Sequence, residues 1–383
     1  MAKLGEVCIQ ITDGSHNPPS GVEQSEYLML SSKNIDDDFI TLDSPRFLSH
    51  SDYIAENKRT TVSEGDLLMT IVGTIGRVAI VPKELNGICL QRSVAVIKPN
   101  KEIINNRYLM YQLQNMQSFL EKEARGVAQK GIYLKQVSQL DIKLPELEQQ
   151  KQIVKVLDKV SKLIFLRKQQ LSKLDELVKA RFVEMFGDPS NNPMGWKKQN
   201  FEDIALLITD GEHMTPQRTN KGIYLLSARN ILNHTIQLDD VDYIDEEEYG
   251  RIARRIVPQQ GDVLVSCSGS IGRCCVVPSE LKFQMVRSVA LIRFNNTINP
   301  IFAEWLIATD ELQKQIYTSA TQSSQANLFQ GKIRKLCGYV PPLSLQNQFA
   351  TFVERVDQQK QTVQQSLDKL ELMKKALMQE YFG

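Results

Sequence analysis

Apolar residues follow a coiled-coil pattern in two long segments of the chain. In residues 147–186, which contain neither Gly nor Pro, and again in residues 342–382, apolar residues recur at alternating steps of three and four. This spacing is typical of the a and d positions of a coiled coil, so each segment is predicted to be one long helix. The predicted seam residues are Leu157, Val160, Ile164, Leu171, Leu174, Val178, Val353, Val356, Val363, Leu367, Leu370 and Leu377.

Basic residues interrupt each predicted seam, at different places in the two helices. Arg167 and Arg181 occupy seam positions in the first helix, and Lys360 and Lys374 do so in the second. Neither helix would therefore pair well with a copy of itself. We expect the two helices to pair with each other, antiparallel, as a coiled coil within one chain.

The segments that precede the two helices have strand-like patterns. Two apolar runs, residues 66–72 and 77–82, flank Gly73-Thr74-Ile75-Gly76, which predicts a β-hairpin. Residues 107–124 instead have the periodicity of an amphipathic helix. The chain is therefore predicted to be of the α+β class, with globular segments that combine strands and helices.

The whole pattern occurs twice. The sequence GDLLMTIVGTIGRVAIVP of residues 65–82 recurs at residues 261–278 as GDVLVSCSGSIGRCCVVP, and ITDG at residues 11–14 recurs 197 positions later. An offset that stays near 196 indicates one domain-sized unit used twice, and antiparallel helices would relate the two copies by a pseudo-twofold axis. The predicted boundaries are head 1 (residues 1–144), a central helical spacer (145–187), head 2 (188–340) and a distal helical spacer (341–383).

Composition and charge narrow the possible classes of protein. The 383 residues are 42% hydrophobic with a formal net charge of +1, and no apolar run is long enough to cross a membrane. The N-terminus lacks the apolar stretch of a signal peptide, so we expect a cytoplasmic protein. Six cysteines without CxxC spacing predict reduced thiols and no metal site.

The two heads differ most just before their closing strands. There ARGVAQKGIYL (residues 124–134) stands against ATQSSQANLF (residues 320–329). Amide and basic side chains can bond base edges in the major groove, although a solvated loop has the same composition. The base-contact candidates in these loops are Gln129, Lys130, Gln322, Ser323, Gln325 and Asn327.

Positive charges that recur in both heads are candidates for contacts with DNA phosphates, which do not depend on sequence. The alternative is that these arginines pair with carboxylates such as Asp66 or Asp262. The phosphate-contact candidates are Lys33, Arg77, Arg92, Arg229, Arg273 and Arg287.

The repeated ITDG loop offers one carboxylate and one histidine in each head. This is a poor catalytic set, and we interpret Asp13 and Asp210 as caps of their own backbone turns. The loop could still lie against DNA. Further base-contact candidates there are His16, Asn17, His213 and Arg218.

One motif suggests an enzyme. Asn17-Pro18-Pro19 is the start of the motif with which amino-methyltransferases hold the nitrogen that they methylate. However, Ser20 stands where that motif needs an aromatic residue, and the second copy has no Asn-Pro-Pro. No glycine-rich cofactor loop accompanies it, so no catalytic residue is predicted.

Taken together, these features resemble one known family. The carriers are TDGSH and TDGEH, the two GDxL…GxIGR stretches, LPELEQQKQIVKVLDKV after head 1, and the paired helix ends MFGDP and YFG. In this order and twice over, they resemble the DNA-specificity subunit of type I restriction–modification systems. The resemblance covers essentially all 383 residues.

The resemblance implies a function without catalysis. Each head would be a target recognition domain for one half of a bipartite DNA site, and the helices would set the spacer length. The helices would also dock two methyltransferase subunits, which carry S-adenosylmethionine and methylate adenine. A restriction subunit, driven by ATP with Mg²⁺, could join them. The alternative is a coiled-coil scaffold with two protein-binding heads.

Overall fold

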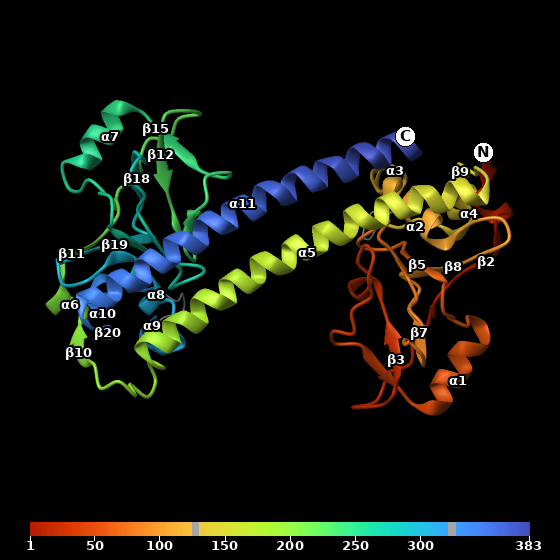
Figure 1. The fold of residues 1–383 in the computed structure, drawn as a ribbon, viewed down its shortest axis with the longest axis horizontal. Coiled ribbons are helices and arrows are strands. Elements are labelled where there is room, and N and C mark those ends of the chain that lie inside the picture. Colours follow the sequence, from red (N-terminus) through yellow and green to blue (C-terminus); the bar gives the residue numbers. More distant parts are fainter. Residues whose placement is uncertain (125–129, 321–326) are drawn as a thin grey trace. The chain divides into compact units, whose positions relative to one another are not determined.

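The computed structural model describes residues 1–124, 130–320 and 327–383 (Figure 1). The chain divides into two compact units. Unit 1 comprises Met1–Lys168 and Gln365–Gly383, and unit 2 comprises Gln169–Gln364. Each unit therefore contains one head together with part of each long helix.

Head 1 contains a four-stranded antiparallel sheet in the order β2-β8-β5-β6 and a three-stranded sheet in the order β4-β3-β7. In the second sheet β3 and β7 are parallel. The elements are β1 (Ala2–Lys3), η1 (Leu4–Glu6), β2 (Cys8–Asp13), β3 (Tyr27–Leu30), η2 (Ser32–Asn34), β4 (Arg46–Leu48), α1 (His50–Arg59), β5 (Leu67–Thr70), β6 (Val78–Ile80), β7 (Ile88–Leu90), β8 (Val94–Pro99), α2 (Asn106–Asn115), α3 (Gln117–Glu123), α4 (Leu134–Ser138) and β9 (Asp141–Ile142).

Head 2 repeats this topology, with sheets in the orders β11-β19-β16-β17 and β15-β12-β18. Its elements are β10 (Lys197–Asn200), α6 (Phe201–Ile204), β11 (Ala205–Asp210), β12 (Ile223–Leu226), η3 (Ala228–Asn230), β13 (Ile231–Leu232), β14 (Thr235–Ile236), β15 (Asp242–Ile244), α7 (Glu246–Ala253), β16 (Val263–Ser266), β17 (Cys274–Val276), β18 (Phe283–Met285), β19 (Val289–Phe294), α8 (Pro300–Ile307), α9 (Asp310–Ala320), α10 (Gln330–Arg334) and β20 (Cys337–Val340).

Strand β5 is almost entirely apolar because it is buried on both faces of its sheet. Leu67 and Met69 pack into one cluster, which includes α2 and both long helices, whereas Leu68 packs into the cluster beneath the smaller sheet. Alternate residues of a strand point to opposite faces, so a strand covered on both sides must be apolar throughout. The predicted hairpin is confirmed, because β5 pairs antiparallel with β6.

The two long helices are α5 (Leu147–Phe186) and α11 (Leu343–Phe382). In unit 1, Lys168 Nζ of α5 lies 2.9 Å from Glu371 Oε1 of α11, and Leu157 shares a core with Phe382. In unit 2, Lys360 Nζ lies 2.7 Å from Asp175 Oδ1, and the Phe182 ring meets that of Phe349. The predicted antiparallel pairing is thus present in each unit. All twelve predicted seam residues are buried or half-buried.

A glutamine at the start of each long helix holds that helix to its own head. The Gln150 side chain accepts from Asn105 N at 2.8 Å and donates to Pro145 O at 2.8 Å. Gln346 makes the same bonds with Asn299 and Pro341 in head 2. Both glutamines are fully buried, so their hydrogen bonds replace lost contacts with water.

In unit 1, ion pairs join head 1 to the two long helices. The Arg107 guanidinium lies 2.7 Å from Asp158 of α5, and Lys374 of α11 lies 3.6 Å from Asp38. Both cations lie over the Tyr111 ring, each 5.5 Å from its centroid. These contacts join α2 to both long helices within the unit.

The matching junction of unit 2 is aromatic. His234, which occupies the place of Asp38, stacks on Trp305 of α8 with ring centroids 3.9 Å apart. The buried Glu304 carboxylate lies 3.5 Å from His234 Nδ1 and accepts a hydrogen bond from Val276 N. Phe349 of α11 contacts Trp305 edge-on, so the stack continues into the helix pair.

Candidate nucleic-acid interface

The repeated ITDG loop ends the first strand of each large sheet. A Cβ atom at Gly14 would lie 2.1 Å from Leu90 O, and one at Gly211 would lie 2.3 Å from Met285 O. The next residue bonds the same carbonyl, through Ser15 N at 2.7 Å in head 1 and Glu212 N at 2.8 Å in head 2. Only glycine permits this close approach of two backbones, which explains why it recurs.

The aspartates of this loop hold side chains, which corrects our interpretation of them as backbone caps. Asp13 binds His16 Nε2 at 2.7 Å and the Arg59 guanidinium at 2.9 Å. Asp210 binds His213 at 3.0 Å and Arg255 at 2.7 Å. Each aspartate thereby ties its loop to the end of a helix-bearing segment and fixes the direction of an exposed histidine.

The Asp210 carboxylate is favoured in its charged form. Its partial burial acts to raise its pKa, but hydrogen bonds from His213, Arg255 and Gln330 outweigh that effect and lower the pKa below its ordinary value of 3.8. Donors to a carboxylate stabilise the ionised state. The loop of head 2 is therefore clamped by a charged group over the physiological pH range.

Several loops of head 1 converge on Ser93. Ser32 N donates to Ser93 Oγ at 3.1 Å, and Ile71 N donates to Ser93 O at 2.9 Å. The neighbouring Arg92 N donates to Ser15 O at 2.9 Å. The turn with Arg92, the η2 turn with Lys33, the hairpin turn and the ITDG loop thus meet at one edge of the head.

Head 2 builds the same convergence on Ser288. Ala228 N donates to Ser288 Oγ at 3.0 Å, Cys267 N donates to Ser288 O at 2.8 Å, and Arg287 N donates to Glu212 O at 3.0 Å. Each bond is the counterpart of one in head 1. The two heads therefore present equivalent loop clusters built from the repeated residues.

The divergent segment of each head lies beside the same cluster. In head 1, Val72 pairs with Gly131, and Ile132 N donates to Ile71 O at 2.9 Å. In head 2, Ser268 pairs with Asn327. Lys130 is exposed next to this contact, and Asn327 is half-buried within its own. The other candidates from these segments lie outside the described residues; they are Gln129, Gln322, Ser323 and Gln325.

Two matched arginines are the most available positive charges of the clusters. Arg92 and Arg287 are exposed, and within the described residues neither guanidinium has a hydrogen-bond or ion-pair partner. His16, Asn17 and His213 are also exposed on the adjacent loops. Each cluster therefore combines a free guanidinium with an oriented imidazole, groups that suit a phosphate or a base edge.

Four other predicted cations, Lys33, Arg77, Arg218 and Arg229, are already engaged by the protein. Lys33 Nζ donates to Ser44 O at 2.7 Å, and Arg77 lies 3.5 Å from Asp36. Arg218 and Arg229 both contact Asp242, at 3.0 Å each. Arg273 is half-buried. A contact between these groups and DNA would have to compete with an existing partner, Arg273 excepted.

The recurring arginines do not pair with Asp66 or Asp262, but the alternative of a carboxylate partner is confirmed for Arg77 with Asp36 and for Arg229 with Asp242. Lys98 binds Asp66, and Arg293 binds the nearly buried Asp262 through two bonds of 2.7 Å. Lys98 and Arg293 are themselves matched positions one strand away. Within the described residues, Arg92, Arg273 and Arg287 have no carboxylate partner.

Sequence reasoning missed Arg59 and Arg255, which hold the ITDG aspartates. The signal was present, because these two arginines are separated by the repeat offset of 196 positions. Arg59 ends α1 and Arg255 follows α7. The sequences of these two helices mostly differ, so the match was hidden by its surroundings. A residue-by-residue search at the repeat offset would have found them.

Burial shields several thiols from reaction. Burial raises the pKa of Cys8, Cys89 and Cys267 to about 12, so these groups stay protonated at neutral pH. Across residues 1–124, 130–320 and 327–383, no group of three or more His, Cys, Asp or Glu side chains could hold a metal ion. Over the same ranges, no helix is long and apolar enough to cross a membrane.

Two equivalent loop clusters on a duplicated α+β fold define a protein with two similar binding heads. The type I restriction modification DNA specificity domain matches residues 29–176 and 193–372. These two matches cover most of the chain, one for each head with its following helix. The chain therefore belongs to the type I DNA-specificity family.

Similar proteins in this family are specificity subunits. The type I restriction enzyme EcoBI specificity subunit of Escherichia coli is 38% identical over 100 residues, 26% of this chain and 21% of that protein. The type I restriction enzyme MjaVIII specificity subunit of Methanocaldococcus jannaschii is 23% identical over 227 residues, 56% of this chain and 52% of that protein. The matched segments thus span at most about half the length of these relatives.

Solved structures share the fold along the whole chain. The S subunit of a type I restriction–modification system from M. genitalium is 14% identical with a TM-score of 0.61, covering 100% of this chain and 95% of that one. A chain from a study of complex assembly and conformational transition of the type I system is 17% identical with a TM-score of 0.56 and covers 96% of that chain. At these identities the likeness concerns the fold alone.

Proposed function

We propose that this chain is the non-catalytic subunit that recognises DNA for a type I restriction–modification complex. Each head would contact one half of a bipartite target through its loop cluster. The observation that carries this proposal is the pair of equivalent clusters, around Ser93 and around Ser288, each with a divergent segment beside a repeated frame. The repeated residues of the clusters suit contacts with phosphates, which do not depend on sequence. The divergent segments suit contacts with two different half-sites.

The chemistry would belong to partner subunits. We expect two methyltransferase subunits, which bind S-adenosylmethionine and methylate adenine, and a restriction subunit that uses ATP and Mg²⁺. Partner subunits would also supply phosphate contacts that a chain of net charge +1 lacks. The exposed faces of α5 and α11 are the expected docking surfaces.

The proposal is tested by co-expressing the chain with the methyltransferase encoded beside it and mapping methylated adenines across the genome. We expect a split motif with a fixed non-specific spacer. A continuous motif, or no methylation, would overturn the proposal. In the second case a scaffold with two protein-binding heads becomes the better explanation, and a gel shift on mixed-sequence duplex DNA separates the two.

Exchange of one head supplies the matched control. Replacement of residues 1–144 by the corresponding head of another specificity subunit should change one half of the split motif. The other half and the spacer should stay unchanged, because head 2 and both helices are retained. A change in both halves would contradict the assignment of one half-site to each head.

A further inference from the structure

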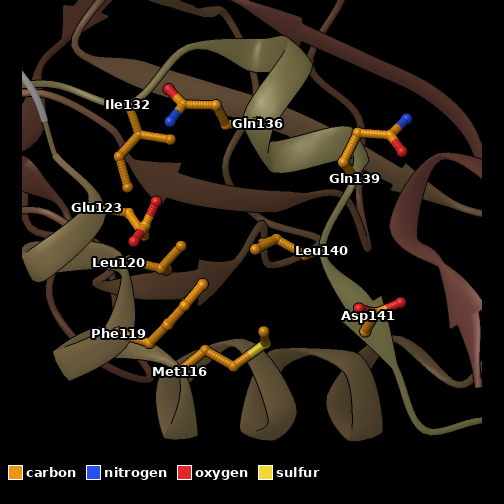
Figure 2. Close-up of a pocket in the computed structure, with 9 residues that line it drawn as sticks. All are labelled: Met116, Phe119, Leu120, Glu123, Ile132, Gln136, Gln139, Leu140 and Asp141. Atoms are coloured by element: carbon orange, nitrogen blue, oxygen red, sulfur yellow. The ribbon is translucent and has the colours of Figure 1, made fainter.

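Head 1 contains a partly apolar pocket that Ile132, next to the divergent segment, helps to line. It has a volume of about 280 Å³ and lies between the α2–α3 corner and β9. Figure 2 shows Met116, Phe119 and Leu120 on one side of the pocket, and Leu140 and Asp141 on the other. Phe119 is 51% exposed.

At the matching place in head 2 the protein itself bonds the outer edge of β20, although a pocket of about 370 Å³ lined by Gln315, Ser319, Lys335 and Leu336 remains there. Gln117 and Gln313 each pack on the last glycine of the hairpin turn, Gly76 and Gly272, which sets the offset at 196. At that offset, the counterpart of Phe119 is Gln315. This glutamine donates to Cys337 O at 3.1 Å and accepts from Cys337 N at 2.9 Å. Its carboxamide thus satisfies both backbone groups on the outer edge of β20.

Asp141 stands where head 2 has Cys337. In both heads the residue before it accepts a backbone bond of 2.9 Å, Leu140 O from Leu4 N and Leu336 O from Phe201 N. The pairs Lys3–Asp141 and Asn200–Cys337 are therefore the non-hydrogen-bonded kind, whose backbone groups point away from the partner strand. Within the described residues, Asp141 N and O have no hydrogen-bond partner.

The charge of the pocket rim places a second requirement on a ligand. Among the described residues that line the pocket, Glu123 and Asp141 are the charged ones, and both are acidic. Lys3 pairs with one Asp141 oxygen at 2.6 Å, and no described residue pairs with Glu123. A ligand that carries a positive charge next to its polar group would complement this rim.

We infer that this pocket binds an extended segment of a partner protein that presents a Gln or Asn side chain beside a Lys or Arg. The carboxamide would take the place of Gln315, accepting from Asp141 N and donating to Asp141 O. An apolar neighbour in the segment would cover Phe119 and Leu120. The inference concerns protein binding and goes beyond the proposed recognition of DNA.

The test is a peptide array probed with the full chain. Ten-residue peptides carry a central Gln flanked by Leu and Lys in varied order, and each has a counterpart with Glu in place of Gln. Glu offers no N–H to Asp141 O, so the Gln peptides should bind more tightly than their counterparts. Fluorescence anisotropy then measures the affinity of the best peptide.

Two variants of Phe119 decide the site of binding. Phe119→Gln should bond Asp141 N and O from within the chain, as Gln315 bonds Cys337, and weaken binding about tenfold, the value of two net hydrogen bonds. Phe119→Leu keeps the pocket apolar without an amide and should bind within about twofold of the parent. Because Phe119 is half-exposed, neither variant should fail to fold.

Hydrogen exchange at the Asp141 amide gives an independent measurement. In the parent chain, the peptide should slow the exchange of this amide. In Phe119→Gln, the exchange should already be slow without peptide. Equal binding of Gln and Glu peptides, unchanged affinity in Phe119→Gln, or an Asp141 amide that does not respond would overturn the inference. None of these results would alter the methylation motif, so the two proposals can fail separately.

Discussion

The two head–helix junctions are built at matching positions from different side chains, with ion pairs in unit 1 and stacked rings in unit 2. Asp38 and His234 have the same left-handed backbone, with φ of 71° and 65°, and both backbone N–H groups bond a β-strand carbonyl. Yet Asp38 faces Lys374 and Arg107, whereas His234 stacks on Trp305. The backbone positions are therefore retained while the side chains that join head and helices have diverged.

This difference predicts different sensitivities. An ion-pair network at a half-exposed surface is weakened by salt, because mobile ions screen its charges. Stacked rings respond little to salt, because their energy comes from buried apolar area and ring contact. Unit 1 should therefore lose more of its junction energy than unit 2 when ionic strength rises.

The largest expected effect comes from the aromatic side. Phe182 of α5 is buried against Phe186, Phe302 and Phe349. Phe182→Ala should lower the free energy of unfolding of unit 2 by about 3–5 kcal/mol. Hydrogen exchange should localise the loss to head 2. The matched Met378→Ala should loosen head 1 instead, and equal loosening of both heads in either variant would break the comparison.

Binding to DNA should fall in parallel when either free arginine is removed. Arg92→Ala and Arg287→Ala should each weaken binding of the assembled complex severalfold, on all sequences alike, and lower the slope of log K against log salt by about 1. Gel shifts at several salt concentrations measure this. A loss confined to one target sequence would instead make that arginine a base contact.

A smaller effect is expected at the ionic junction. Lys374→Met should cost up to about 1 kcal/mol in low salt and less in high salt, since the pair with Asp38 is partly exposed. Val178 occupies the matching position of α5, and Val178→Met offers a control without a charge. Denaturation at two ionic strengths should show salt dependence for the first change alone.

The smallest effect concerns pH. Because the pKa of Asp210 is lowered in the folded chain, its contribution is present above its ordinary pKa of 3.8 and is lost as pH falls through the lower folded value. Exchange of amides at residues 211–213 should therefore speed up in acid. Asp210→Asn should show that faster exchange already at neutral pH, and an acid response that persists in this variant would assign the effect elsewhere.

The repeat and the apolar periodicity were sufficient to predict the α+β heads, the hairpin and the paired helices. These depend on local spacing and on which faces must be buried. Side-chain partners were harder: Asp13 meets Arg59, and Asp66 meets Lys98, across strands and helices far apart in sequence. Such choices depend on register and reach, which no short pattern records.

The candidate interface was predicted in the same uneven way. The exposed positions of Arg92 and Arg287 fit the expectation from repetition, but the convergence of the loops on Ser93 and Ser288 had no signal in the sequence. Serine is common in loops, and its role here comes from two backbone-directed bonds. The lack, within the described residues of head 1, of a counterpart to the Gln315–Cys337 bonds likewise became visible only when the two heads were compared.

The division of each long helix between two units has a consequence for how the protein is made. Met378 and Phe382 belong to the core of head 1, although the ribosome reaches them only after all of head 2. Domains usually fold as they emerge, the N-terminal one first. Here the first head to be synthesised keeps part of its apolar surface uncovered until α11 has been translated. Head 1 therefore stays accessible to chaperones and proteases until α11 covers this surface.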